Sequence, residues 1–252
     1  MFHDFLALVR RLERAQALQN ERFNEAVGGH SMPLGGGFAH FRGEGHPLNQ
    51  ALGLVEAISI ADLTAVEAFL GSPTVLELSP GADPSLWPLL AERGYRLQQF
   101  QQLWIRPLTD ASEASTTAQV RVAEPADAYL YNRIVCAGFL ERDDWRDLEP
   151  PFRLSLEVPD AWGFLALAHG EPAGGGMLGI VDGVALLSGD GVLPRHRGQG
   201  LQKALIQARL AFARARGCDV ACASTAPGTA SQRSYEACGF RAAYPKVEMA
   251  RG

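Results

Sequence analysis

The sequence predicts an α/β fold made of two similar halves. Residues 91–96 resemble residues 236–241 at an offset of 145 positions (236 − 91), and each segment runs into alternating polar and apolar residues. At the same offset the expected strand 74–78 falls on 219–223. Both halves therefore end as strand, helix, glycine turn and strand, which is typical of a duplicated unit. The alternative is that both reuse a common helix end, since glycine frequently follows an amphipathic helix.

The length and composition fit a globular chain of two domains. Of 252 residues, 47% are hydrophobic and 20% are charged, which excludes a disordered or low-complexity polymer. At roughly 100–200 residues per domain, two ordinary domains fit this length. Residues 109–117 are small and polar with almost nothing to bury, which is the composition of a linker. We therefore predict one domain over 1–108 and a second over 118–252.

The charge balance and the cysteines exclude several classes of protein. The net charge of −5 removes the global attraction on which non-specific nucleic-acid binding depends. No run approaches 18 apolar residues, and the first residues carry no secretory leader. Four cysteines are too few for a disulfide scaffold, and Cys218 with Cys222 lacks the partners of a metal site. We expect a cytoplasmic protein with buried thiols that binds no metal, nucleic acid or membrane.

The N-terminal half is predicted to be a long helix followed by alternating strands and helices. Apolar residues over 2–23 are spaced for one face of a helix. Ser59 is a suitable N-cap for a helix to about Leu70, and Asp83 followed by Pro84 has the pattern that opens another. The expected strands are 38–41 after a glycine break at 35–37, 74–78 after Pro73, and the alternating segment that ends at Arg106.

The C-terminal half is predicted to contain more strands, joined by short turns. The pairs His169-Gly170 and Asp182-Gly183 have the composition of turns between neighbouring strands. The expected strands are 120–123, 164–168, 174–181, 184–187, 219–223 and the segment after residue 241. The expected helices are 126–139, 201–217 and 231–238.

A glycine-rich turn opens the helix that begins at Leu201. A helix N-terminus offers unpaired backbone N–H groups and the positive end of the helix dipole. Gly198 and Gly200 would let an anion approach this backbone without a Cβ in the way, and Arg195, Arg197 and Lys203 place mobile positive charge beside it. Pro194 would help to preset the turn. The pattern predicts a diphosphate-binding site.

The Rossmann dinucleotide fingerprint is the competing interpretation of such a loop. It requires a third glycine and an acidic residue about 20 positions later, and here that glycine is absent and 221–225 contain no acid. A P-loop, a Gly-x-Ser-x-Gly elbow and a His-Glu-x-x-His motif are also absent from the sequence.

The segment Arg195-x-x-Gly198-x-Gly200, after a strand ending in Val-Leu-Pro, resembles the pyrophosphate motif of the GNAT superfamily of acyl-CoA N-acyltransferases. The resemblance covers about 120–249. It implies two GNAT-like domains, each a mixed, mostly antiparallel twisted sheet flanked by helices, and acetyl-CoA as cosubstrate. It further implies that the backbone of Val192 and Leu193 pairs with the pantetheine arm. The residues whose amides would hold the diphosphate are Arg197, Gly198, Gln199, Gly200 and Leu201.

The resemblance extends to the last helix, where the family often has a tyrosine that protonates the leaving thiolate. Tyr235, Gly239 and Phe240 match the family pattern, whereas Gly228 stands where an asparagine is usual. A phenol stays protonated at neutral pH, so Tyr235 is our candidate general acid, the alternative being an ordinary packed tyrosine. Ser231 lies one turn earlier on the same face, after a capping-box pattern at 229–232, and we expect it to contact the coenzyme.

The base that accepts the proton of the amine is less specified. Asp190 stands just before the phosphate loop, where the family often places an acidic base, but an Asp-Gly pair also shapes strand ends. His196 and the acidic cluster 141–144 are alternatives. The N-terminal half has no Arg-x-x-Gly-x-Gly motif, and Leu90 falls on Tyr235 (235 − 145), so we expect a degenerate copy that does not bind coenzyme.

The sequence therefore predicts an acetyltransferase that transfers an acetyl group from acetyl-CoA to a primary amine by direct attack in a ternary complex. A backbone N–H of the strand that carries Val192 would polarise the thioester carbonyl. A non-catalytic acyl-CoA binding or sensor protein is the alternative. The acceptor, a small molecule or a peptide, and the oligomeric state, a homodimer included, are left open.

Overall fold

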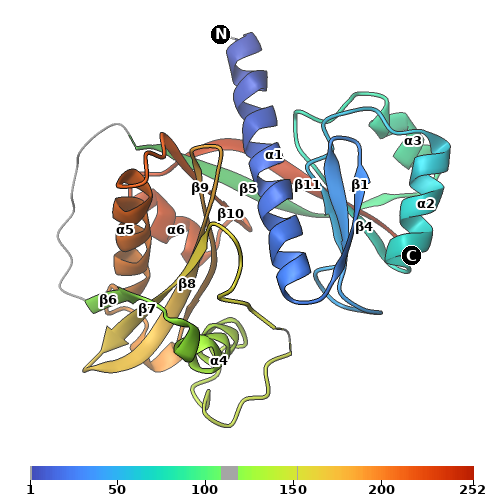
Figure 1. Cartoon of the computed structure of the whole chain (residues 1–252). Helices are drawn as coiled ribbons and strands as arrows, with labels where there is room; N and C mark the ends of the chain where they lie inside the picture. Colours follow the sequence, from blue (N-terminus) through green and yellow to red (C-terminus); the bar gives the residue numbers. More distant parts are fainter. Residues whose placement is uncertain (1, 109–118, 152) are drawn as a thin grey trace. The chain divides into compact units, whose positions relative to one another are not determined.

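The computed structural model describes residues 2–108, 119–151 and 153–252, so the expected linker 109–117 lies outside the described residues (Figure 1). The chain divides into two compact units. Unit 1 comprises Met1–Leu103, Thr225–Pro227 and Ala243–Gly252, and unit 2 comprises Trp104–Ser224 and Gly228–Ala242.

The described residues form an α/β protein, as the sequence predicts. The helices are α1 (Phe2–Ala26), α2 (Ile60–Leu70), α3 (Leu86–Glu92), η1 (Pro125–Asp127), α4 (Ala128–Phe139), η2 (Pro194–His196), α5 (Leu201–Arg214) and α6 (Ala230–Ala237). The strands are β1 (His30–Leu34), β2 (Gly37–Phe41), β3 (Gln50–Leu52), β4 (Thr74–Leu78), β5 (Arg96–Pro107), β6 (Gln119–Val122), β7 (Ala161–Ala168), β8 (Glu171–Val181), β9 (Val184–Val192), β10 (Val220–Thr225) and β11 (Arg241–Arg251).

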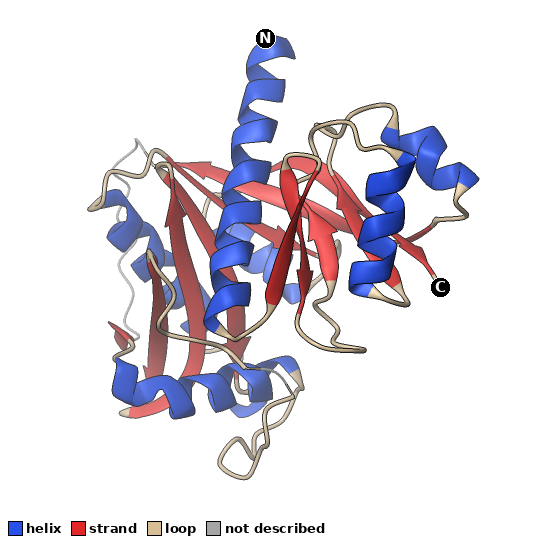
Figure 2. Cartoon of the chain, turned by 45° about the vertical axis from the view of Figure 1, so that its right-hand side comes forward, coloured by secondary structure: helices blue, strands red, loops and turns tan. Residues whose placement is uncertain are grey.

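Unit 1 is a sheet with helices on both faces. Its strand order is β1-β2-β3-β4-β11-β5, and the pairs β1/β2, β2/β3 and β4/β11 are antiparallel whereas β3/β4 is parallel. In Figure 2, α1 lies on one side of this sheet and α2 on the other. The apolar core includes Leu63 and Val66 of α2, Leu76 of β4 and Leu86 of α3, all completely buried. This core accounts for the compactness of unit 1.

A group of buried charges lies beneath α1 in unit 1. Lys246 of β11 places Nζ 2.9 Å from Oε1 of both Glu13 and Glu77, and the hydroxyl of Tyr244 donates to Glu13 Oε1 at 2.8 Å. Burial by itself would lower the pKa of Lys246, but the two carboxylates raise it above its usual range. A buried ion pair of this kind contributes little net stability while complete, but losing one partner is strongly destabilising.

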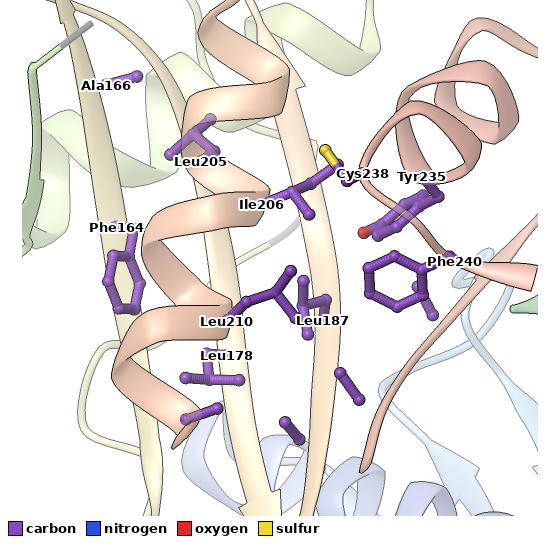
Figure 3. Packing of buried hydrophobic residues seen from close by; sticks show 14 of the residues in the cluster. Phe164, Ala166, Leu178, Leu187, Leu205, Ile206, Leu210, Tyr235, Cys238 and Phe240 are labelled. Atoms are coloured by element: carbon purple, nitrogen blue, oxygen red, sulfur yellow. The ribbon is translucent and has the colours of Figure 1, made fainter. Parts of the chain in front are cut away.

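The strands of unit 2 are flanked by α5 and α4. Its strand order is β5-β10-β9-β8-β7-β6, in which β10/β9 is parallel and β9/β8, β8/β7 and β7/β6 are antiparallel. Figure 3 shows α5 packed on the sheet, with Leu205, Ile206 and Leu210 against Phe164 and Leu187. Helix α4 contacts β8 and β9. Both units therefore have a mixed, mostly antiparallel sheet, as the family resemblance implies.

The internal repeat in the sequence is also a repeat of structure. Shifted by 145 positions, α6 covers 85–92 and β11 covers 96–106, which are nearly the bounds of α3 and β5. The last strand of each repeat pairs unexpectedly, however. Residues Val247–Arg251 of β11 pair with β4 in unit 1, and β5 lies beside β10 in unit 2. Each unit therefore contains residues from both sides of the predicted division at 109–117. That division stays a prediction, because the segment is not described.

Several element boundaries differ from those predicted. Strands β1 and β3 were not predicted, because β1 contains Pro33 and β3 has only three residues. Helix α3 begins after Ser85 rather than after Asp83, whose carboxylate accepts from the backbone N–H of Ser85 at 3.0 Å and forms a turn before the helix. The Ser59 cap of α2 is confirmed, since Ser59 Oγ accepts from Asp62 N at 3.1 Å.

Candidate active site

The site is built around the end of β9, which has one edge without a neighbouring strand. The parallel ladder joins Val184–Leu186 of β9 to Val220–Cys222 of β10. Strand β9 continues to Val192, longer than the predicted 184–187, and within the described residues this later part is not in the ladder with β10. Its backbone groups on that edge can therefore pair with an extended ligand, much as an added strand would.

Helix α4 lies unusually close to the other side of this segment because of two glycines. A Cβ at Gly138 would lie 2.7 Å from the backbone nitrogen of Val192, and one at Gly191 would lie 2.5 Å from the carbonyl oxygen of Val135. Contacts that short are impossible, so both positions require glycine. The end of β9 is thereby fixed directly against α4.

The predicted phosphate loop follows β9 and opens α5. Gly198 and Gly200 have φ of 77° and 80°, a conformation that favours glycine, and Gly200 is the N-cap of α5 without a side-chain cap. A Cβ at either position would meet nothing within 4 Å, so open space lies beside the turn. The exposed side chain of Lys203 lies in the first turn of α5. This geometry suits an anion at a helix N-terminus.

Arg197 differs from the mobile cation expected from the sequence. Its Nη1 lies 3.0 Å from Glu141 Oε1, and its guanidinium also donates to the carbonyl oxygens of Gly138 at 2.9 Å and Val192 at 3.3 Å. The side chain therefore fastens the loop to the end of α4. The loop cations with freer side chains are Arg195, whose Nε donates to His196 Nε2 at 3.1 Å, and Lys203.

The acidic cluster 141–144 also holds the loop in place. Asp143 Oδ1 accepts from the backbone N–H of Arg195 at 3.0 Å, and Glu141 pairs with Arg197. Arg142 and Asp144 form an ion pair with each other. Each of these acidic side chains therefore already has a partner, which is a backbone N–H or a guanidinium group. We interpret the cluster as support for the loop rather than as a base.

The two predicted catalytic residues lie in contact with each other. The hydroxyl of Tyr235 on α6 donates to Asp190 Oδ2 of β9 at 2.5 Å, and Asp190 Oδ1 pairs with the guanidinium of Arg209 on α5. Tyr235 is 2% exposed and Arg209 completely buried. Tyr235 lies beside Phe240, with ring centroids 5.0 Å apart (Figure 3). Burial, and then the charge of Asp190, raises the pKa of Tyr235 well above its usual value, so the phenol is protonated at neutral pH.

Arg209 is the site residue that the sequence reasoning missed. It lies eight positions after Leu201 and four after Leu205, in the apolar stripe of α5. A charge within such a stripe is the signal in the sequence. Burial alone would lower the pKa of Arg209, but Asp190 raises it. The guanidinium is therefore a permanent positive charge inside the unit.

The last helix begins where the sequence predicts, with one change in its cap. Thr229 Oγ1 accepts from the N–H of Gln232 at 3.3 Å, but the Gln232 side chain accepts from Gly228 N at 2.8 Å instead of from Thr229. Gly228, where the resemblance leads one to expect asparagine, therefore contributes its backbone only. Ser231 is half-buried in the first turn, on the face of Tyr235.

Comparison with known proteins bears on the region that holds this site. Residues 129–240 match the model of the acetyltransferase (GNAT) family. We refer to residues 129–240 as the GNAT domain because of this match. This GNAT domain contains the phosphate loop, Arg209 and Tyr235, and its family uses acetyl-CoA as a cosubstrate. No curated protein sequence matches the chain.

Solved structures resemble the chain well beyond the GNAT domain. A GCN5-related N-acetyltransferase from Kribbella flavida is 19% identical, with a TM-score of 0.68, 96% of this chain and 94% of that chain covered. A tandem GNAT protein from the clavulanic acid biosynthesis pathway is 16% identical, with a TM-score of 0.57 and coverage of 87% and 80%. A putative GNAT acetyltransferase from Novosphingobium aromaticivorans is 20% identical, with a TM-score of 0.53 and coverage of 78% and 83%. At these identities the likeness shows the fold.

The described residues contain neither a candidate membrane span nor a candidate metal cluster. None of the described helices combines the length and the apolar character that crossing a membrane requires. In the same part of the chain, no group of three or more His, Cys, Asp or Glu side chains is arranged to hold a metal ion.

Proposed function

We propose that the chain is an acetyl-CoA-dependent N-acetyltransferase that acetylates a primary amine within a ternary complex. The observation that carries the proposal is the continuity of three features: the unpaired edge of β9, the left-handed turn at Gly198 and Gly200, and the uncapped N-terminus of α5. Together they offer a surface for an extended ligand, followed directly by a surface that binds an anion. A pantetheine arm followed by a diphosphate has the same order of chemistry.

The residues of the GNAT domain fit the coenzyme by charge and by space. The backbone of Val192 and Leu193 would pair with the pantetheine arm. The amides that would hold the diphosphate belong to Arg197, Gly198, Gln199, Gly200 and Leu201, beside open space. Arg195 and Lys203 would add positive charge, while Arg197 would keep the loop attached to α4. Ser231 would contact the coenzyme from α6.

The chemistry needs one new bond, one broken bond and two proton movements. Acetyl-CoA supplies the thioester: the amine nitrogen bonds to its carbonyl carbon, the carbon–sulfur bond breaks, the nitrogen loses a proton and the thiolate gains one. A backbone N–H near Val192 would polarise the carbonyl, and positioning in the ternary complex would contribute much of the rate. Tyr235 would give the thiolate its proton, and its raised pKa keeps it protonated.

Asp190, the base candidate of the sequence, already contacts two side chains of the protein. One of its oxygens accepts from Tyr235 and the other pairs with Arg209, so both already face donors. We therefore propose that water or His196 takes the proton of the amine. Asp190 would instead hold the hydroxyl of Tyr235.

Unit 1 would not bind a second coenzyme. At the position that matches Tyr235 it has Leu90, which is completely buried in α3, and the matching loop has no Arg-x-x-Gly-x-Gly motif. A buried leucine cannot donate a proton. We propose that unit 2 alone carries the acetyltransferase site.

Thiol release from acetyl-CoA in the presence of a panel of primary amines and peptides tests the proposed function. We expect at least one amine to give release that depends on the protein, with the acetylated amine detected by mass spectrometry. Tyr235→Phe should lower kcat by about a hundredfold if the phenol is the acid. Tyr129→Phe, at a tyrosine 68% exposed, is the control and should keep wild-type activity. Binding of acetyl-CoA without acetylation of any amine would favour the sensor alternative.

A further inference from the structure

The guanidinium of Arg209 is placed where a strand of the GNAT domain is irregular. Between the pairs Gly175↔Gly191 and Met177↔Ser188 of β8 and β9, one residue of β8, Gly176, faces two of β9, Gly189 and Asp190. Gly189 has a φ of 64°. One extra residue with a left-handed glycine is a β-bulge, a feature that re-aims a side chain. Here the side chain that is re-aimed is Asp190, toward α5 and α6.

Arg209 donates to backbone groups of both strands beside this bulge. Its Nη1 donates to the carbonyl oxygens of Met177 at 2.9 Å and Ser188 at 3.3 Å, and its Nε donates to Leu205 O at 3.0 Å in its own helix. The remaining Nη2 pairs with Asp190. A planar guanidinium can make these contacts at once because its donors are fixed in a fork. One side chain thus ties α5 to both strands of the bulge.

The opposite strand leaves room for this arrangement. A Cβ at Gly176 would lie 2.5 Å from Asp190 Oδ1 and 2.9 Å from Arg209 Cζ, so any larger residue would displace the ion pair. Glycine at 176, the left-handed Gly189 and the buried arginine are thus three separate features that serve one contact. Packing alone needs no charge here, because two apolar side chains would fill the same volume.

We propose that Arg209 is a positioning residue for acetyl transfer, which holds Asp190 at the bulge so that Asp190 in turn holds the hydroxyl of Tyr235. The inference rests on the proposed function, since it assigns Arg209 and Asp190 to the same site. In this role neither residue needs to touch the reacting atoms. They affect the reaction by orienting the phenol of Tyr235. This orientation determines whether the phenol can give its proton to the thiolate.

The test replaces the ion pair by apolar residues, in the double variant Asp190→Leu with Arg209→Leu. A buried ion pair replaced as a whole is commonly tolerated, whereas removing one partner is not, so the double variant should fold. We expect its KM for acetyl-CoA to stay within about threefold and its kcat to fall about as far as that of Tyr235→Phe. Adding Tyr235→Phe to the double variant should lower kcat no further, because the pair acts through Tyr235.

A spectroscopic measurement reports the same contact without turnover. In the wild type the hydroxyl proton of Tyr235, held by a carboxylate, should give a slowly exchanging downfield resonance that Tyr235→Phe removes. We expect the double leucine variant to lose this resonance and Tyr129→Phe, a control at a tyrosine 68% exposed, to keep it. A resonance that persists in the double variant, or a folded double variant with wild-type kcat, overturns the inference. Failure of the wild type to bind acetyl-CoA would instead contradict the proposed function.

Discussion

At the scale of single residues, the structure assigns different tasks to charges that look alike in the sequence. Arg197 and Arg209 are both arginines of the GNAT domain, yet Arg197 fastens an exposed loop and Arg209 lies completely buried at a bulge. The exposed pair between Arg197 and Glu141 contributes little to stability, whereas the contact of Arg209 with Asp190 is desolvated and sensitive to the loss of either partner. Burial therefore decides the consequence of each substitution.

His40 provides a prediction about pH at this scale. It is 1% exposed on β2, its Nδ1 lies 3.1 Å from Ser31 Oγ, and burial together with the charge of Arg42 lowers its pKa to about 4. Because the folded pKa lies below the unfolded value, the contribution to stability is present above pH 6.5 and is lost as the pH falls through about 4.

We expect the free energy of unfolding of the wild type, measured with urea, to fall by about 2 kcal/mol more than that of His40→Gln between pH 7 and 4.5. The exposed His30→Asn serves as the control and should follow the wild type. Equal losses in wild type and His40→Gln would show that His40 is not the group responsible.

At the scale of elements, the end of α4 illustrates strain beside a functional loop. Glu141 follows the last turn of α4 with a φ of 57°, and Arg142 N donates to Ala137 O at 2.9 Å across it. Glycine is the usual residue in this left-handed position, since other residues lose about 1 kcal/mol there. The carboxylate of Glu141 reaches Arg197, which offers a reason for a non-glycine residue.

The prediction for this helix end compares two substitutions. Glu141→Gly removes both the backbone strain and the exposed ion pair, so its free energy of unfolding should equal or exceed that of the wild type by up to about 1 kcal/mol. Glu141→Ala keeps the strain and loses the pair, so it should be less stable than Glu141→Gly by about 1 kcal/mol. Chemical unfolding measures both, and equal destabilisation by the two would rule out strain at this residue.

Elements with a strong local pattern could be predicted from the sequence, and irregular ones could not. The apolar spacing of α1, the Ser59 cap and the paired glycines of the phosphate loop are local signals, and each element forms as predicted. Short β3 has only three residues and depends on its neighbours in the sheet. The bulge at Gly189 and the position of Arg209 against it arise from the register between strands, which no single segment encodes.

At the scale of the whole molecule, the same limit applies to which strand joins which sheet. The offset of 145 positions identifies the repeat and predicts that β11 belongs to the same unit as β10. In the structure β11 pairs with β4 instead. Ala243–Gly252 belongs to unit 1, where Lys246 pairs with Glu13 and Glu77. The pairing joins segments far apart in the chain, so it cannot be read from the repeat alone.

Removal of residues 243–252 should therefore affect unit 1 rather than only the C-terminus. Without Lys246 the two buried glutamates lose their cation, a change that costs about 3–5 kcal/mol, and β4 loses a paired strand. We expect amide hydrogen exchange in β4 and α2 to become fast. Removal of 251–252 alone keeps Lys246 and serves as the control. Wild-type protection of β4 in the longer truncation would contradict this role of β11.

The central claim is that the turn at Gly198 and Gly200 holds the diphosphate of acetyl-CoA, and calorimetric binding tests it most directly. Gly200→Glu would direct a carboxylate into the proposed site, and Gly200→Ala controls for the cost of a side chain at a φ of 80°. We predict that the wild type binds acetyl-CoA and that Gly200→Glu loses about a hundredfold more affinity than Gly200→Ala. No binding to the wild type, or equal binding by the two variants, would contradict the account.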